Sequence, residues 1–221
     1  MELNVERTVE RTENVMEKRV RAVIFDFGQV LVHFDPDYIL ANAIVDDDYR
    51  KTASEIIFSR VYWDKMDDGS LSESELCRLV LPRIAEKYRG AVENAIMNWY
   101  CRLPEWEGMR ELVSDLKQRG VPIFLISNIS RGFAEHSGEI PILSLVDKAV
   151  FSALTDFVKP SAEIFQLACE RFGYPKEQCV FVDDSVKNIK GAAAFGLNTV
   201  LFDGDAVALR GRLSEMLGIA L

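Results

Sequence analysis

Apolar residues gather in five short runs along the chain, each rich in β-branched and aromatic side chains. The runs are Val20–Phe25, Val121–Ser127, Lys148–Phe151, Cys179–Asp183 and Asn198–Phe202. Short apolar runs without polar alternation are typical of strands that are buried on both faces of a parallel sheet. We therefore expect five parallel strands.

Helical patterns lie between these runs. Residues Glu107–Arg119, Ser161–Phe172 and Ser185–Phe195 each place apolar side chains on one helical face, and a glycine follows each segment. Strands that alternate with amphipathic helices indicate an α/β fold with a doubly wound, Rossmann-like parallel sheet.

The segment after the first strand breaks this alternation. Between Phe34 and Pro104 no strand pattern occurs, and helical patterns cover Tyr38–Ala43, Tyr49–Phe58, Ser72–Tyr88 and Ala91–Cys101. We expect this insertion to cover the carboxyl edge of the sheet, where open α/β sheets bind ligands. The predicted division is a charged tail at 1–19, a core at 20–33 and 105–221, and a helical cap at 34–104.

Charge and cysteine content narrow the class of protein. The chain of 221 residues has 26 Lys and Arg against 35 Asp and Glu, a net charge of −9, which argues against a general nucleic-acid or anionic-membrane surface. Its four cysteines form no CxxC pair, and no apolar run reaches the roughly 18 residues of a membrane span. These features predict a cytoplasmic protein, monomer or homodimer, with a small-molecule partner.

Polar residues stand where three of the predicted strands end. The first strand ends in Asp26, the second in Ser127-Asn128 and the fourth in Asp183-Asp184, while Lys159 precedes a helix. Three converging carboxylates cannot all stay ionised without a cation, because like charges raise each other's pKa. Mg²⁺ is the expected cofactor, since it prefers oxygen ligands.

These segments resemble, in the same order, the four motifs of the haloacid dehalogenase-like hydrolase superfamily. The segments are FDFGQVL at 25–31, SN at 127–128, VKP at 158–160, and FVDDS at 181–185 followed by Asn188. A helical insertion also stands where that family has its cap. The resemblance implies a phosphatase that forms an aspartyl-phosphate intermediate.

The resemblance also implies a role for each residue. Asp26 is the expected nucleophile, Lys159 neutralises the transferring group, and Ser127 donates to phosphoryl oxygens. Asn128 is expected to help position the substrate. Expected metal ligands are Asp26, the Gly28 carbonyl, Asp183 (directly or through water) and Asp184.

One position departs from the family pattern. Most phosphatases of the superfamily carry a second aspartate where this chain has Gly28, and that aspartate acts as general acid and base. Gln29 and His33 follow closely; Gln29 is a candidate for positioning water and His33 for the acid–base role, although a structural role of His33 stays open. Asp67-Asp68-Gly69, in the cap, is interpreted as a turn.

The missing acid also bears on the substrate. An enzyme with a weak general acid favours substrates with good leaving groups, which points towards a small sugar phosphate such as a sugar 1-phosphate. Some bacterial sugar-1-phosphate phosphatases of the superfamily resemble this chain in carrying Asp-x-Gly.

Two alternatives remain at this point. The first is a 2-haloacid dehalogenase or a phosphonate-cleaving relative, since both would also lack the second aspartate. The adjacent acids Asp183 and Asp184 argue against a dehalogenase, and no cap lysine has a sequence context that supports phosphonate cleavage. A catalytically weak member that binds a phosphorylated ligand or a protein has Gly28 as its only support.

Overall fold

Five parallel strands form one sheet in the order β3-β2-β1-β4-β5. The structure is a computed structural model that describes residues 19–101 and 103–221, so the predicted tail lies outside it except for Arg19. The strands are β1 (Ala22–Phe25), β2 (Ile123–Ser127), β3 (Lys148–Phe151), β4 (Cys179–Asp183) and β5 (Asn198–Leu201). Strands β1, β2 and β4 lie in the middle of the sheet, so the three strands that end in the candidate site residues are neighbours.

Helices cover both faces of the sheet, because successive side chains of a strand point to opposite sides. Val23 and Phe25 pack against the first helical layer and Ala22 and Ile24 against the second. The first layer contains α7 (Met109–Gln118), α8 (Arg131–His136) and α11 (Ala206–Leu217), and the second contains α9 (Ala162–Phe172) and α10 (Val186–Phe195). The chain is therefore an α/β protein with a doubly wound parallel sheet, as predicted.

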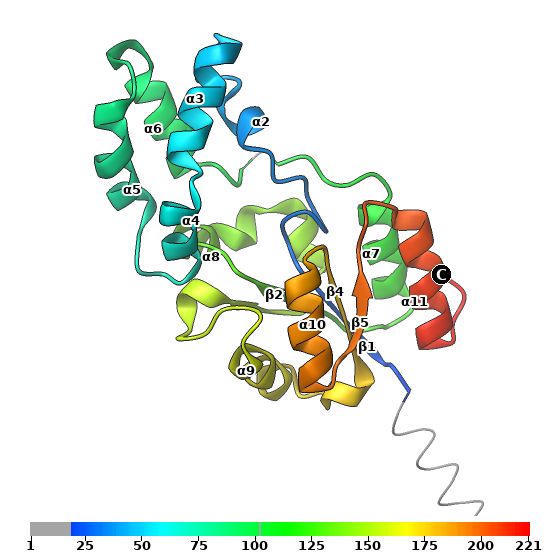
Figure 1. Ribbon diagram of the computed structural model, residues 1–221. Helices are drawn as coiled ribbons and strands as arrows, with labels where there is room; N and C mark the ends of the chain where they lie inside the picture. The colour runs from blue at the N-terminus through cyan, green and yellow to red at the C-terminus, as the bar shows by residue number, and fades with distance from the viewer. Residues whose placement is uncertain (1–18, 102) are drawn as a thin grey trace, which may run out of the picture.

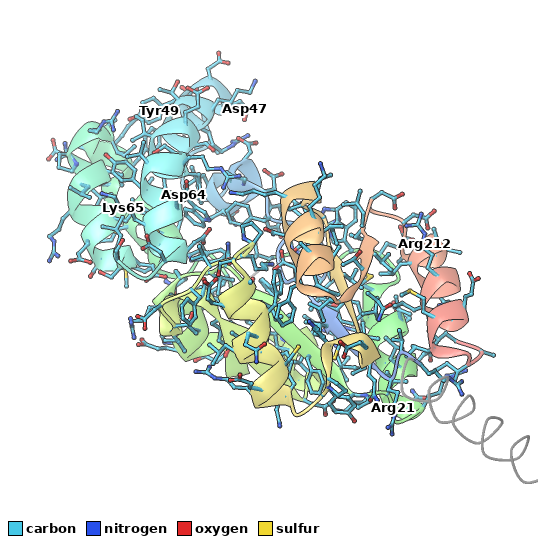
Figure 2. All side chains as sticks on the ribbon, turned by 60° about the horizontal axis from the view of Figure 1, so that its bottom comes forward. Arg21, Asp47, Tyr49, Asp64, Lys65 and Arg212 are labelled. Carbon is cyan, nitrogen blue, oxygen red and sulfur yellow. The ribbon has the colours of Figure 1, made fainter. Side chains whose placement is uncertain are left out.

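The insertion between β1 and α7 is helical and stands over the carboxyl ends of the strands (Figure 1). Its helices are α2 (Pro36–Leu40), α3 (Asp47–Ile57), α4 (Arg60–Asp67), α5 (Glu73–Val80) and α6 (Arg89–Met97). We call residues 36–97 the cap. In Figure 2 Asp47, Tyr49, Asp64 and Lys65 mark the cap, and Arg21 and Arg212 mark the core. The cap buries a hydrophobic cluster of its own, with Leu40, Ile57 and Leu76 fully enclosed.

Two chain segments connect the cap to the core, and they pair with each other. Val32 forms an antiparallel bridge with Glu105, and the His33 amide donates to the Pro104 carbonyl at 2.8 Å. The Trp106 amide donates in turn to the Leu31 carbonyl. The predicted cap boundaries at residues 34 and 104 fall within this paired hinge, and they stay a prediction.

The helices differ from the predicted ones in four places. Helices α4, α8 and α11 were not predicted, and the predicted helix Ser72–Tyr88 ends at Val80, because Pro82 cannot continue it. Ser72 does begin that helix, and its hydroxyl and Glu75 form a reciprocal cap. Gly90 lies in the first turn of α6, and an added Cβ there would meet no atom within 4 Å.

Candidate active site

A buried lysine joins two carboxylates at the carboxyl edge of the sheet. Lys159 Nζ lies 2.8 Å from an oxygen of Asp26 and 2.8 Å from an oxygen of Asp183. Asp26 follows β1 and Asp183 ends β4, so the parallel pairing of these strands brings the two carboxylates together. Lys159 is only 4% exposed and Asp183 is fully buried, which shields both ion pairs from water.

Lys159 and Asp183 are themselves held in place by hydrogen bonds. Asn128 Oδ1 accepts from the Lys159 amide at 2.7 Å, and Asn128 Nδ2 donates to the Lys159 carbonyl at 3.0 Å. Asp183 accepts from the Ser185 amide and from Asn188 Nδ2. Both groups of the Asn128 side chain are therefore occupied in positioning the lysine, although Asn128 also lines the cavity.

Burial and charge shift the protonation of this cluster. Burial raises the pKa of Asp26 well above its usual range; Lys159 lowers it, and the nearby Asp183 raises it further. For Lys159, burial lowers the pKa, but Asp26 and Asp183 outweigh it, so the lysine stays an ammonium. Burial and Asp183 also raise the pKa of Asp184. One ammonium thus faces three carboxylates, and negative charge remains uncompensated.

The carboxylates are arranged so that they fit a divalent cation. Ligand oxygens of Asp26, Asp183 and Asp184 all lie within 4.8 Å of one another. Oxygen donors and excess negative charge are what Mg²⁺ requires. Gly28 lines the same cavity, and a backbone carbonyl is a further type of oxygen ligand that such a cation accepts.

A cavity of about 850 Å³ opens above this cluster, between the core and the cap. Its core side carries Asp26, Ser127 and Lys159, and its cap and hinge side carries the aromatic rings of Phe34, Phe58, Trp63 and Trp99. These four rings pack on one another with centroids 4.9–5.9 Å apart. A pocket with an apolar wall and a few convergent polar groups is the usual form of a small-molecule site.

The structure brings most predicted site residues to this cavity. Asp26, Gly28, Gln29, Ser127, Asn128, Lys159 and Asp184 line it, and Asp183 lies directly beneath, paired with Lys159. Gln29 has a left-handed backbone with φ of 60°, and its Nε2 donates to the Phe34 carbonyl at 2.9 Å. Non-glycine residues rarely adopt this conformation, and where they do they often mark functional sites.

His33 takes a different place. Its ring packs on Trp106 with centroids 3.5 Å apart, and His33 is not among the residues that line the cavity. Its amide belongs to the paired hinge, so the geometry gives His33 a hinge contact.

The cap adds three carboxylates to the cavity wall, Asp64, Asp67 and Asp68, and the last two belong to the segment interpreted from the sequence as a turn. Asp67 is the last residue of α4, it is half-buried, and it lines the cavity. Burial raises the pKa of Asp67 to about 8, and Asp26 and Asp64 add to the effect. An acidic residue at the end of a cap helix is a weak signal in a sequence, and only the docking of the cap reveals its place.

Comparisons with known proteins agree with this architecture. The family model "haloacid dehalogenase-like hydrolase" matches residues 20–196. A phosphorylated carbohydrates phosphatase of Thermotoga maritima is 25% identical over 203 residues, which are 88% of this chain and 93% of that protein. An (S)-2-haloacid dehalogenase of Burkholderia cepacia is 28% identical over 196 residues, 84% of each chain. A drimenol cyclase of Aspergillus calidoustus is 26% identical over 83% of this chain, which spans about a third of that protein.

A solved structure shares the fold. A haloacid dehalogenase family enzyme of Bacteroides thetaiotaomicron, in complex with magnesium and inorganic phosphate, has a TM-score of 0.66 at 19% identity over 86% of this chain and 98% of its own. In the part of the chain that the structure describes, no helix is long and apolar enough to cross a membrane. The family match over most of the chain and the shared fold show that this protein belongs to the haloacid dehalogenase-like hydrolases.

Proposed function

We propose that the protein is a Mg²⁺-dependent phosphatase that hydrolyses a small phosphorylated metabolite through an aspartyl-phosphate on Asp26. The observation that carries the proposal is the pairing of Asp26 with Lys159 and Asp183 on the floor of a cavity that also receives Asp184. A binding protein has no need of a carboxylate held in this way. The phosphatases among its relatives support the same reaction class.

Each residue has a defined part in this reaction. Asp26 attacks the phosphorus, and Lys159 holds the attacking carboxylate in place and offsets negative charge on the transferring group. Ser127, at the end of β2, donates its hydroxyl to a phosphoryl oxygen, and Asn128 keeps the lysine in position. Gln29 is placed on the cavity wall to bind substrate or water.

The residues present fit the metal. Asp26, Asp184 and the Gly28 carbonyl would hold Mg²⁺, with Asp183 binding directly or through a water molecule. When bound, Mg²⁺ supplies positive charge that stabilises the phosphoryl oxygens as the phosphorus is attacked.

The substrate class follows from the two sides of the cavity. The charged floor suits a phosphoryl group, and the aromatic wall suits the apolar face of a compact ring. A sugar phosphate fits both, and a sugar 1-phosphate has an anomeric leaving oxygen that needs little protonation. The phosphorylated carbohydrates phosphatase among the relatives is consistent with this choice.

The test is phosphate release from sugar phosphates, nucleotides and an aryl phosphate, with Mg²⁺ or with a chelator. Turnover that requires Mg²⁺ and is lost in Asp26→Asn is the expected result. Asp48→Asn, an exposed carboxylate of the cap, is the matched control. Release of phosphate by Asp26→Asn at the wild-type rate would refute the assignment of Asp26 as the nucleophile.

A 2-haloacid dehalogenase is the second candidate, because three relatives carry that name and position 28 has no acid. The excess of carboxylates around one lysine speaks against it, since a halide-releasing reaction gains nothing from a cation site. Halide release from 2-chloropropionate in chelator, without phosphate release from any ester, would replace the phosphatase proposal.

A further inference from the structure

Phosphate-ester hydrolysis through a carboxylate needs a second, proton-transferring group. One proton must reach the leaving oxygen, and another must leave the attacking water. At position 28 a glycine offers no such group. An added Cβ there would lie 3.8 Å from its nearest neighbour, an ordinary contact, and the backbone φ is not left-handed, so packing does not require glycine.

The cap brings three carboxyl groups to the cavity that holds Asp26, and they belong to Asp64, Asp67 and Asp68. Asp67 ends α4, is half-buried and lines the cavity, and no described residue donates a hydrogen bond to its carboxyl group. Asp68 is exposed and accepts from the Ser70 amide, and Asp64 is exposed and pairs with Arg60. The carboxyl group of Asp67 is therefore available to a ligand.

The backbone of Asp67 is tied to the loop that carries the phosphate-binding residues. The hydroxyl of Ser152, which is fully buried, donates to the Asp67 carbonyl and accepts from the Ile129 amide. Ile129 directly follows Ser127 and Asn128. One buried hydroxyl thus connects the end of α4 to the end of β2.

Gly69 and Glu73 add two further contacts that hold this part of the cap on the core. Gly69 has φ of +77° and packs so closely on Ala153 that a Cβ would lie 2.8 Å from its carbonyl oxygen. Glu73, 5% exposed, accepts from the hydroxyl of Ser130 at the start of α8. Asp67 therefore sits on a docked segment and not on a free turn.

We infer that Asp67 is the general acid and base of this active site, in place of the carboxylate that position 28 lacks. The inference rests on the proposed phosphatase function. In the first step Asp26 forms a bond to phosphorus, the bond from phosphorus to the leaving oxygen breaks, and Asp67 gives its proton to that oxygen. In the second step Asp67 takes a proton from water, the water oxygen bonds to phosphorus, and the bond to Asp26 breaks to release inorganic phosphate.

The charges around Asp67 suit both steps. Burial, Asp26 and Asp64 raise its pKa, while Lys159 and Arg60 lower it, and the result of about 8 lies near neutral pH. A group with such a pKa is protonated often enough to act as an acid and ionised often enough to act as a base. Burial is the largest of these causes, and it does not depend on the charge of Asp26.

The test compares Asp67→Asn with Asp48→Asn, which removes the same charge from an exposed residue of the cap that does not line the cavity. The substrates are glycerol phosphate, whose leaving alcohol needs a proton, and p-nitrophenyl phosphate, whose leaving group does not. For Asp67→Asn we expect kcat on glycerol phosphate to fall by about 10²–10⁴-fold. On p-nitrophenyl phosphate we expect a burst of one nitrophenol per active site and then slow turnover, since only the second step has lost its base. Asp48→Asn is expected to stay within about threefold of wild type on both, a range that corresponds to less than 1 kcal/mol.

The burst separates catalysis from structure, because it counts folded, reactive sites. Acid quenching during slow turnover is expected to trap phosphate on Asp26 in Asp67→Asn. A variant that turns over glycerol phosphate within threefold of wild type, or one that raises KM without a burst, would overturn the inference and leave the phosphatase intact. A wild-type protein that releases phosphate from neither ester would instead refute the proposed function and, with it, this role of Asp67.

Discussion

Lys159 lies between two buried carboxylates, and replacing it by methionine tests the electrostatic account of the site. The substitution keeps most of the side-chain volume and removes the ammonium that is 2.8 Å from both Asp26 and Asp183. Removing one partner of a buried ion pair costs about 3–5 kcal/mol, because the remaining charge stays buried and uncompensated. For a chain of this length, 1 kcal/mol corresponds to roughly 2–4 °C in Tm, so the expected loss is about 6–20 °C at pH 8.

The pH dependence of that loss separates charge from packing. Without the ammonium, the pKa of Asp26 rises further, since Lys159 is what lowers it. A carboxyl group with a raised pKa in the folded state stabilises fully below its unfolded pKa and loses that stabilisation as the pH rises through its folded pKa. The deficit of Lys159→Met is therefore expected to be smaller at pH 5 than at pH 8.

The measurement is thermal unfolding by circular dichroism, in chelator, at both pH values. Lys190→Met, at an exposed lysine of α10, is the control for removing a positive charge. A deficit below about 2 °C, or one of the same size at pH 5 and pH 8, would refute the charge argument.

Three further predictions concern stability and the backbone. Because the pKa values of Asp26 and Asp67 are raised from 3.8, the Tm of the metal-free protein is expected to fall as the pH rises from about 4 to 8. Mg²⁺ is expected to restore part of that Tm at pH 8, and a Tm that does not change with pH would contradict the prediction. Gly69→Ala is expected to lower the free energy of unfolding by about 1–3 kcal/mol, because its φ is +77° and the added Cβ meets a carbonyl oxygen at 2.8 Å. Gly90→Ala, in open space within α6, is expected not to lower Tm, and equal Tm values of the two variants would refute the docking contact. Gly28→Ala is expected to keep Mg²⁺-dependent turnover within about tenfold, since only the backbone carbonyl of Gly28 is used and its added Cβ has room; a loss above 10²-fold would contradict that role.

The sheet was predictable because its strands carry a strong local signal. All five predicted strands are present, and the bounds of β3 and β4 agree to the residue. Buried parallel strands need apolar side chains on both faces, so the sequence of each strand is enough to identify it. The approach of Asp26 and Asp183 also follows once the strand order is assumed, since parallel strands end at one edge. Lys159 lies in the loop before α9, so strand order alone does not place it.

The missed helices carry weaker local signals. Helix α4 begins after Ser59, whose side chain makes no capping hydrogen bond, and its sequence mixes charged and aromatic residues. Helix α8 has six residues and is held in place by its neighbours. Tertiary contacts decide such segments, and a single sequence does not show them.

The same reason explains the two differences at the site. His33 and Asp67 both belong to connecting segments, whose side chains point where the cap and the core meet. The ring of His33 packs on Trp106 and does not line the cavity, whereas Ser152 anchors the end of α4 beside it. Those contacts join residues 73 and 85 positions apart in the chain, beyond the reach of local patterns.

The cap has its own hydrophobic cluster, apart from the two that pack on the sheet, and this division bears on how such a protein changes over generations. A substitution inside the cap cluster, at Leu40 or Leu76, disturbs neighbours that belong to the cap and leaves the side chains around β1 and β4 in place. Selection can therefore alter the part of the pocket wall that packs on the cap cluster, such as Phe58, while the lysine–carboxylate floor is inherited unchanged. Lineages that carry this architecture are free to diversify in what they recognise at little risk to the chemistry they share.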